Sequence, residues 1–155
     1  MTRGGKVVVR DLGWQKIKVA VRELDGRGVK VGIRAGSGSN DGVPIVQYAI
    51  FQEYGTDTIP ARPFLRRTVD TSEREIATFG RSLAAGIIAG RINAEVALDR
   101  LGLWFTDRVQ QSITSARSWA TPLAASTVRQ KGSSAPLIDK GLLRAAVSYE
   151  KTRRR

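Results

Sequence analysis

The sequence predicts an α+β fold in which a small antiparallel sheet packs against two long antiparallel helices, with extended loops between the elements. Two features of the chain favour this class. Val29–Ala35 alternates apolar and basic residues, as expected of a half-buried strand. Between Asp70 and Ser115, apolar residues recur at helical spacing in two runs that Gly90 and Asn93 separate. Two such helices joined by a short turn form an antiparallel hairpin.

The composition predicts one folded domain without cysteine or histidine chemistry. The chain has 155 residues, of which 41% are apolar and 6% aromatic, enough for a core of mainly aliphatic side chains. It has no cysteine, which excludes disulfides and thiolate metal sites, and no histidine, the commonest general base. We expect a single domain over residues 1–150 and a disordered basic tail over residues 151–155.

The N-terminal part of the chain predicts a helix followed by a strand. Lys6–Arg10 is rich in valine and suits a short strand or an extended arm. Trp14–Leu24 fits both a strand and a helical stripe. We favour a helix, because Asp25–Gly28 ends it and the strand Val29–Ala35 follows. The glycine-rich segment Gly36–Pro44 is expected to be a flexible surface loop.

The next segment, Ile45–Tyr54, is expected to be a helix that ends at Gly55. Its apolar side holds Ala49 and Ile50 and could extend to Glu53.

After this helix we expect an ordered loop over Thr56–Arg62, followed by a turn that begins at Pro63 and carries Phe64 and Leu65. A long helix should begin at Asp70 or Thr71 and end at Gly90. A second long helix, capped by Asn93, is expected over residues 94–115, with Trp104 in the core. One or two helical turns over residues 123–130, a short helix or turn over residues 137–145 and a candidate closing strand over residues 146–150 complete the prediction.

The net charge of +12 is concentrated at the two ends of the chain. Residues 1–34 carry a net charge of +6 and residues 132–155 carry +4, whereas residues 35–90 carry −1. This distribution suits a polyanionic partner, either nucleic acid or an acidic protein surface, although solubility alone also explains it. The aromatic residues that single-strand binders use for base stacking are scarce.

The sequence offers no arrangement of residues typical of catalysis. Glu73 and Glu75 lie two residues apart and do not share a helix face. Ser133 and Ser134 have no identifiable base nearby. We therefore expect no enzyme activity, no cofactor and no metal site. The near-apolar run Leu83–Gly90 is too short to cross a bilayer, so we also expect no membrane association.

Two stretches of the chain share a pattern with a known family. They are DGVPIVQYAIFQEYGTDTIPARPFLRRTVD, residues 41–70, and TPLAASTVRQKGSSAPLIDKGLLRAAVSYE, residues 121–150. Both resemble the tailed-bacteriophage tail-completion or neck proteins, the small virion morphogenesis proteins of the head–tail junction. One departure is Lys140, where the family pattern has Thr. The matching residues are Glu53, Tyr54, Gly55, Thr56, Pro60, Ala61, Arg62, Pro63 and Phe64 in the first stretch, and Pro122, Leu123, Lys131, Gly132, Ser133, Ser134, Pro136, Leu137, Ile138, Asp139, Gly141, Leu143 and Arg144 in the second.

The resemblance implies a structural virion protein that is made in the bacterial host cytoplasm and catalyses no reaction. Such proteins form rings, commonly hexameric, that complete the tail and join it to the DNA-filled head. The implied partners are copies of the same chain, neighbouring neck and tail-tube proteins, and the genomic DNA that passes through the channel. Whether the ring is a tail terminator or a head-closure ring stays open, and a basic architectural nucleic-acid-binding protein is the alternative.

Under this resemblance the segment EYGTDTIPARPFLRR is a pre-ordered docking element. We expect Arg62, Arg66 and Arg67 to bind carboxylates of a neighbouring subunit or ring. Phe64 either fills a groove on the next subunit or belongs to the core, and Trp119 is a candidate interface anchor or a lid over residues 123–130. The tail residues Arg153, Arg154 and Arg155 are candidate contacts to DNA or to an acidic partner.

Overall fold

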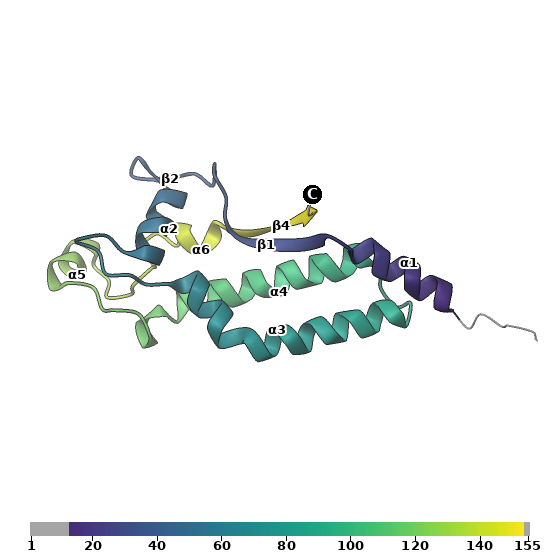
Figure 1. The fold of residues 1–155 in the computed structure, drawn as a ribbon. Helices are drawn as coiled ribbons and strands as arrows, with labels where there is room; N and C mark the ends of the chain where they lie inside the picture. Colours follow the sequence, from purple (N-terminus) through teal and green to yellow (C-terminus); the bar gives the residue numbers. More distant parts are fainter. Residues whose placement is uncertain (1–12, 154–155) are drawn as a thin grey trace, which may run out of the picture.

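The computed structural model describes residues 13–153, and the α+β prediction is confirmed. The helices are α1 (Trp14–Leu24), α2 (Ile45–Tyr54), α3 (Phe64–Ile88), α4 (Ala94–Thr114), α5 (Ala125–Lys131) and α6 (Leu142–Ala145), with a 3₁₀ turn at Ala116–Ser118. The strands are β1 (Arg27–Ile33), β2 (Ser39–Asn40), β3 (Val43–Pro44) and β4 (Val147–Arg153). Figure 1 shows an elongated molecule in which α4 lies between the β1–β4 sheet on one side and α3 on the other.

The main sheet pairs the strand that follows α1 with the last strand of the described chain. β1 and β4 pair antiparallel from Arg27 opposite Arg153 to Ile33 opposite Val147. The expectation of a disordered tail from residue 151 is therefore wrong for residues 151–153, because the first residues of β1 give them a backbone partner. Residues 154–155 and the possible strand at residues 6–10 lie outside the described residues.

A close approach between strand and helix holds this sheet on α4. The ring of Tyr149 lies against Gly102, so close that a Cβ at residue 102 would lie 2.3 Å from the ring. The Tyr149 hydroxyl donates a hydrogen bond to Asp99 of α4 at 3.2 Å. Lys151 forms ion pairs with Asp99 at 2.9 Å and with Glu95 at 2.8 Å.

The segment expected to be a flexible loop contains a short hairpin. β2 and β3 pair antiparallel, and the turn between them is formed by Asp41 and Gly42. Both turn residues have positive φ, 50° and 84°, which is typical of the tight turns that favour Asp-Gly. The ion pair between Asp41 and Lys140, 2.8 Å long, connects this hairpin to the segment after α5.

The first long helix begins six residues earlier than predicted. α3 starts at Phe64, and Pro63 is its N-cap residue. Thr71, expected near the start, lies inside the helix, where its hydroxyl donates to the Arg67 carbonyl at 2.8 Å. The second long helix begins as predicted, since the Asn93 side chain accepts from the Val96 amide at 2.9 Å.

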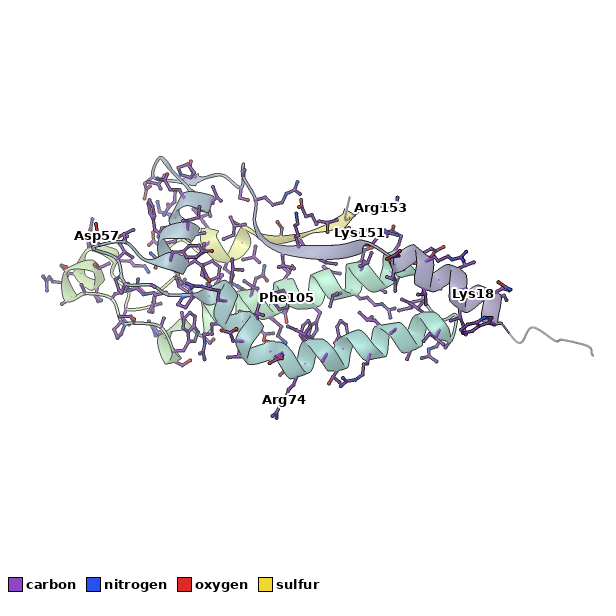
Figure 2. The ribbon with its side chains drawn as sticks, viewed as in Figure 1. Lys18, Asp57, Arg74, Phe105, Lys151 and Arg153 are labelled. Carbon is purple, nitrogen blue, oxygen red and sulfur yellow. The ribbon has the colours of Figure 1, made fainter. Side chains whose placement is uncertain are left out.

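The hydrophobic core consists of two separate clusters of buried side chains, at different places along the elongated molecule. The larger one surrounds Phe64, Val109 and Ile113 at the end where α2, α3, α4 and α6 meet. The smaller one joins Leu83, Ile87 and Ala97, with α1 packed against it. Between them Trp104, predicted to be core, is only half-buried and stacks on Phe79 with ring centroids 5.3 Å apart. Figure 2 shows side chains projecting from the whole length of this narrow molecule.

Candidate interaction surface

Glu53 organises the region that the sequence analysis singled out. It lies in the last turn of α2 with 3% of its surface exposed. Its carboxylate accepts hydrogen bonds from the backbone amides of Leu65 and Arg66, at 2.9 and 3.0 Å. These amides belong to the first turn of α3, whose own N-cap residue makes no side-chain cap bond. Glu53 therefore caps a helix that begins eleven residues after it, and a carboxylate is favoured at that positive end.

The loop between α2 and α3 is folded tightly back on α2. The Arg62 amide donates to the Gln52 carbonyl at 2.6 Å, and the Thr56 amide donates to the Ile59 carbonyl at 2.8 Å. Gly55 has a φ of 78°, and a Cβ there would lie 3.0 Å from the Ile59 carbonyl oxygen. The expectation of an ordered loop is confirmed, and glycine is required at its first residue.

Arg62 and Phe64 are buried, so Arg62 is not presented to a neighbour as predicted, and of the two alternatives for Phe64 the structure shows the core. Phe64 has no exposed surface and belongs to the larger core cluster. Arg62 is 4% exposed, and its guanidinium donates to Thr121 O at 2.8 Å, Gln52 Oε1 at 3.0 Å and Pro122 O at 3.3 Å. The bonds to Thr121 and Pro122 explain the burial, because Arg62 fixes a segment some sixty residues later onto the loop.

Arg66, which is exposed, and Arg67 and Trp119, which are half-buried, form a group at the surface around the start of α3. The guanidinium carbon of Arg67 lies 5.0 Å from the centre of the Trp119 ring, and that of Arg66 lies 4.9 Å from the centre of the Tyr54 ring. Both distances fit cation–π contacts. Trp119 is half-buried and anchored, since its indole N–H donates to the Ser112 carbonyl at 3.0 Å.

A shallow cleft of about 410 Å³ lies beside this group. Arg66, Arg67 and Trp119 line it together with Pro63 and Asp70. We call these five residues the Arg67–Trp119 surface. It contains three of the five residues predicted to dock a partner.

The basic residues of the sheet are partly neutralised within the molecule. Arg27 and Lys151 both form ion pairs with Glu95, and Arg34 lies 3.8 Å from Glu150. Arg153 is exposed at the end of β4. Arg154 and Arg155, the other predicted contacts, lie outside the described residues.

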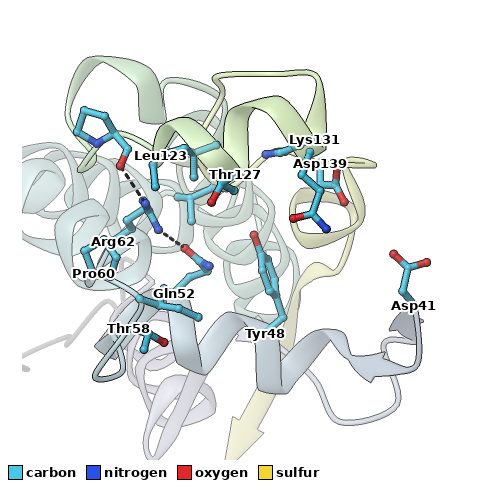
Figure 3. Close-up of a pocket in the computed structure, with 15 residues that line it drawn as sticks. Asp41, Tyr48, Gln52, Thr58, Pro60, Arg62, Leu123, Thr127, Lys131 and Asp139 are labelled. Carbon is cyan, nitrogen blue, oxygen red and sulfur yellow. Dashed lines mark hydrogen bonds between the residues drawn. The ribbon is translucent and has the colours of Figure 1, made fainter.

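A larger cavity of about 700 Å³ opens between α2, the loop at residues 55–63 and the segment containing α5 (Figure 3). Arg62 and Lys131 both line it, with Tyr48 between them in this view. Asp139 and Asp41 lie on the side away from Arg62. Residues of both stretches that carry the family resemblance therefore line this cavity.

Burial shifts the pKa of three groups that line this cavity. It lowers the pKa of the Arg62 guanidinium, and it lowers the pKa of Lys131 more than the nearby Asp139 raises it. Burial likewise raises the pKa of Tyr48, so its hydroxyl stays protonated and can donate a hydrogen bond. Outside the cavity, the hydrogen bond to Asp41 raises the pKa of Lys140.

The sequence analysis missed the acceptor side of this region. The sequence places Glu53 at the edge of an apolar stripe and among the residues that match the family pattern, but predicts no capping role for it and no role for Gln52 or Tyr48. Glu53 precedes Gly55 and Pro63 at short range, so a carboxylate before a helix stop and a proline start was a usable signal for a cap. Nothing in the sequence indicated that the carbonyls of Thr121 and Pro122 receive Arg62.

Residues 13–153 contain no group of three or more acidic side chains arranged to hold a metal ion. None of the helices in this part of the chain is long and apolar enough to cross a membrane. Comparison of the chain with protein-family models, with curated proteins and with solved structures finds no match.

Proposed function

We propose that this chain is a structural virion protein of a tailed bacteriophage, and that copies of it form a ring, hexameric as in the resembling family, at the head–tail junction. In this proposal the ring completes the tail, joins it to the DNA-filled head, and catalyses no reaction. One observation carries the proposal: the two stretches that resemble the neck proteins form one physical unit. Arg62 of the first stretch binds Thr121 and Pro122 of the second, and Lys140 of the second binds Asp41 of the first.

The departure from the family pattern supports this interpretation. Lys140 replaces the expected Thr, yet its ammonium pairs with Asp41 in the β2–β3 hairpin, so this position still connects the two stretches. Among the matching residues, Arg62 and Pro122 are in direct contact across the two stretches, and this contact supports the proposal.

A ring requires two different patches on each subunit that meet head to tail. The Arg67–Trp119 surface is one candidate patch, since half-buried tryptophan and arginine are enriched at the centres of interfaces. The outer edges of the main sheet are the second candidate. Within the described residues, the backbone groups of residues 28–33 and 147–153 bond only within the β1–β4 ladder, so both edges are open to another strand.

The proposal is tested by native mass spectrometry and negative-stain electron microscopy of the purified chain. We expect closed rings with a central channel. Arg67→Glu should shift the population to folded monomers, because it reverses the charge stacked on Trp119. Arg74→Glu, an equal charge change at an exposed site on α3, should leave the rings intact. A chain that is monomeric at every concentration tested, or rings that Arg67→Glu does not affect, would contradict this account.

The alternative, a basic architectural DNA-binding protein, is favoured only by the net charge of +12. It predicts tight binding of duplex DNA by the isolated chain, with an affinity that falls steeply as salt is added. The ring proposal predicts weak binding at physiological salt, and a gel-shift series in increasing salt separates the two. Tail-terminator and head-closure roles are distinguished by which purified partner, tail tube or head connector, the ring binds.

A further inference from the structure

We propose that the cavity between α2, the loop at residues 55–63 and α5 is a binding site for a carboxylate carried by a partner polypeptide. The inference goes beyond the ring proposal and does not depend on it, since it stands on the geometry of this cavity alone. Its walls are shown in Figure 3.

The first argument is the unbalanced charge of Arg62. Its side chain is buried, yet all three of its acceptors are neutral: two backbone carbonyls and the amide oxygen of Gln52. Within the described residues it forms no ion pair. A buried cation without a counter-ion is costly, so an anion that enters beside it recovers part of that cost.

The second argument is donor capacity. A guanidinium has five N–H groups, and the three bonds of Arg62 leave two of them without an acceptor. Lys131 adds a second cation, whose ammonium makes one hydrogen bond, to the Ala135 carbonyl at 2.7 Å. Burial is the main cause that lowers the pKa of Lys131; Asp139 raises this pKa, and Arg62 has a smaller lowering effect. Tyr48 and Thr127 add hydroxyl groups to the same walls.

The third argument concerns the two carboxylates that also line the cavity. Asp41 is already paired with Lys140, and Asp139 accepts a hydrogen bond from the Asn40 side chain at 3.4 Å. Neither lies within ion-pair distance of Arg62 or Lys131. Asp139 still acts electrostatically on Lys131, so Arg62 is the cation of this cavity without an acidic partner among the described residues, and an incoming carboxylate is expected on the Arg62 side.

The shape of the cavity favours a polypeptide over a nucleic acid. Its volume of about 700 Å³ suits one or two side chains, not a duplex. Ile59, Pro60 and Leu123 supply apolar walls that suit the aliphatic part of a glutamate or of a chain end, and a phosphate would leave them without contact. The floor is held in place by Leu137, which is 2% exposed and keeps a positive φ of 63°. That conformation is costly for leucine, so the surrounding core fixes it.

The test uses the full chain and two capped peptides, acetyl-Gly-Glu-Glu-Gly-amide and its Gln-Gln counterpart, at matched ionic strength. Amide chemical shifts measured by NMR during titration report both affinity and location. We expect the Glu peptide to bind in the millimolar range and to shift the resonances of Gln52, Thr127 and Lys131, and the Gln peptide to bind at least about tenfold more weakly. A third peptide with a free C-terminal carboxylate and no acidic side chain tells a chain end from a side chain.

Variants locate the effect. Lys131→Gln should weaken binding of the Glu peptide by roughly three- to tenfold, a change of about 0.7–1.4 kcal/mol. Lys16→Gln removes one charge from an exposed site on α1 and should leave the affinity unchanged. Arg62→Lys keeps the charge but removes the fork of donors, and should weaken binding if it folds. If Arg62→Lys does not fold, the affinity of Lys131→Gln for the Glu peptide and the chemical shifts mapped on the wild type decide whether the peptide binds in the cavity.

Three outcomes would overturn the inference. One is no shift at the cavity with either the Glu peptide or the peptide that has a free C-terminal carboxylate, and another is equal weakening by Lys16→Gln and Lys131→Gln, which indicates diffuse attraction by a basic protein. The third is saturable binding of inorganic phosphate at the cavity without binding of the acidic peptides, which assigns the site to a phosphate instead.

Discussion

Replacing Glu53 with alanine should destabilise the domain by about 2–4 kcal/mol, although the residue takes part in no reaction. Loss of a helix cap costs about 0.5–2 kcal/mol. Here two partly buried amides lose their acceptor, and leaving the second donor unsatisfied adds about 1–2 kcal/mol, the lower part of the range for a buried donor. The ion pair with Arg66 adds little, because 55% of the Arg66 side chain is exposed and water screens it.

Thermal unfolding followed by circular dichroism measures this change. For a chain of this size, each kcal/mol lowers the melting temperature by about 2–4 °C, so Glu53→Ala should melt roughly 5–15 °C below the wild type. Hydrogen exchange of the Leu65 and Arg66 amides should accelerate more than exchange in α4. Asp57→Ala, which removes an exposed carboxylate from the same loop, is the control and should be nearly neutral. Equal melting temperatures for the two variants would refute the role of Glu53 as the cap of α3.

Two further predictions concern the sheet and its supporting helix. Gly102→Ala places a methyl group 2.3 Å from the Tyr149 ring and should destabilise the fold by about 1–3 kcal/mol. Gly80→Ala, where an added methyl group meets no atom within 4 Å, should stabilise α3 by about 0.5–1 kcal/mol. If the melting temperatures of both variants move in the same direction, this contrast is wrong. The hydrogen bond from Lys151 lowers the pKa of Glu95, so this group stabilises the fold above its unfolded pKa, and that stabilisation is lost as pH falls through the lower folded pKa. Glu95→Gln should therefore flatten the acid side of a plot of melting temperature against pH, and an unchanged acid side argues that the ion pair does not form in solution.

The sequence predicts the bounds of those helices whose start and stop signals lie within or next to the helix itself. The bounds of α1 and α2 were predicted from stripes of apolar residues and their stops, and α4 from the cap at Asn93. The start of α3 was missed because its cap comes from the end of another helix. The full length of β4 was missed because its partner β1 lies more than a hundred residues earlier in the chain. The β2–β3 hairpin has a sequence signal, the pair Asp41-Gly42, which is typical of a tight hairpin turn, but the prediction for this segment is a flexible loop.

The sequence predicts which segment forms the candidate site, but not which of its side chains are buried and which are exposed. Proline, glycine and arginine usually mark exposed loops, so Arg62 was expected at the surface. Its burial depends on carbonyl acceptors that only the folded chain brings within reach. Arg66 and Arg67, by contrast, follow Phe64 in the first turn of α3, and the rotation of about 100° per residue turns them away from the buried side that Phe64 faces, so Arg66 is exposed and Arg67 half-buried.

The charge balance at the start of α3 bears on how a partner binds there. Arg66 and Arg67 are offset by Glu53, which pairs with Arg66, and by Asp70, which lines the same cleft. The Arg67–Trp119 surface is therefore nearly neutral, although the whole chain has a net charge of +12. A partner would bind it mainly by packing on the Trp119 ring and by fitting the shape of the cleft. Contacts of this kind are weakly screened, whereas attraction between a basic chain and DNA weakens steeply as salt is added. Rings that persist in salt concentrations at which DNA binding has disappeared would show that two separate surfaces are involved, and rings that dissociate together with DNA would tie assembly to the basic charge instead.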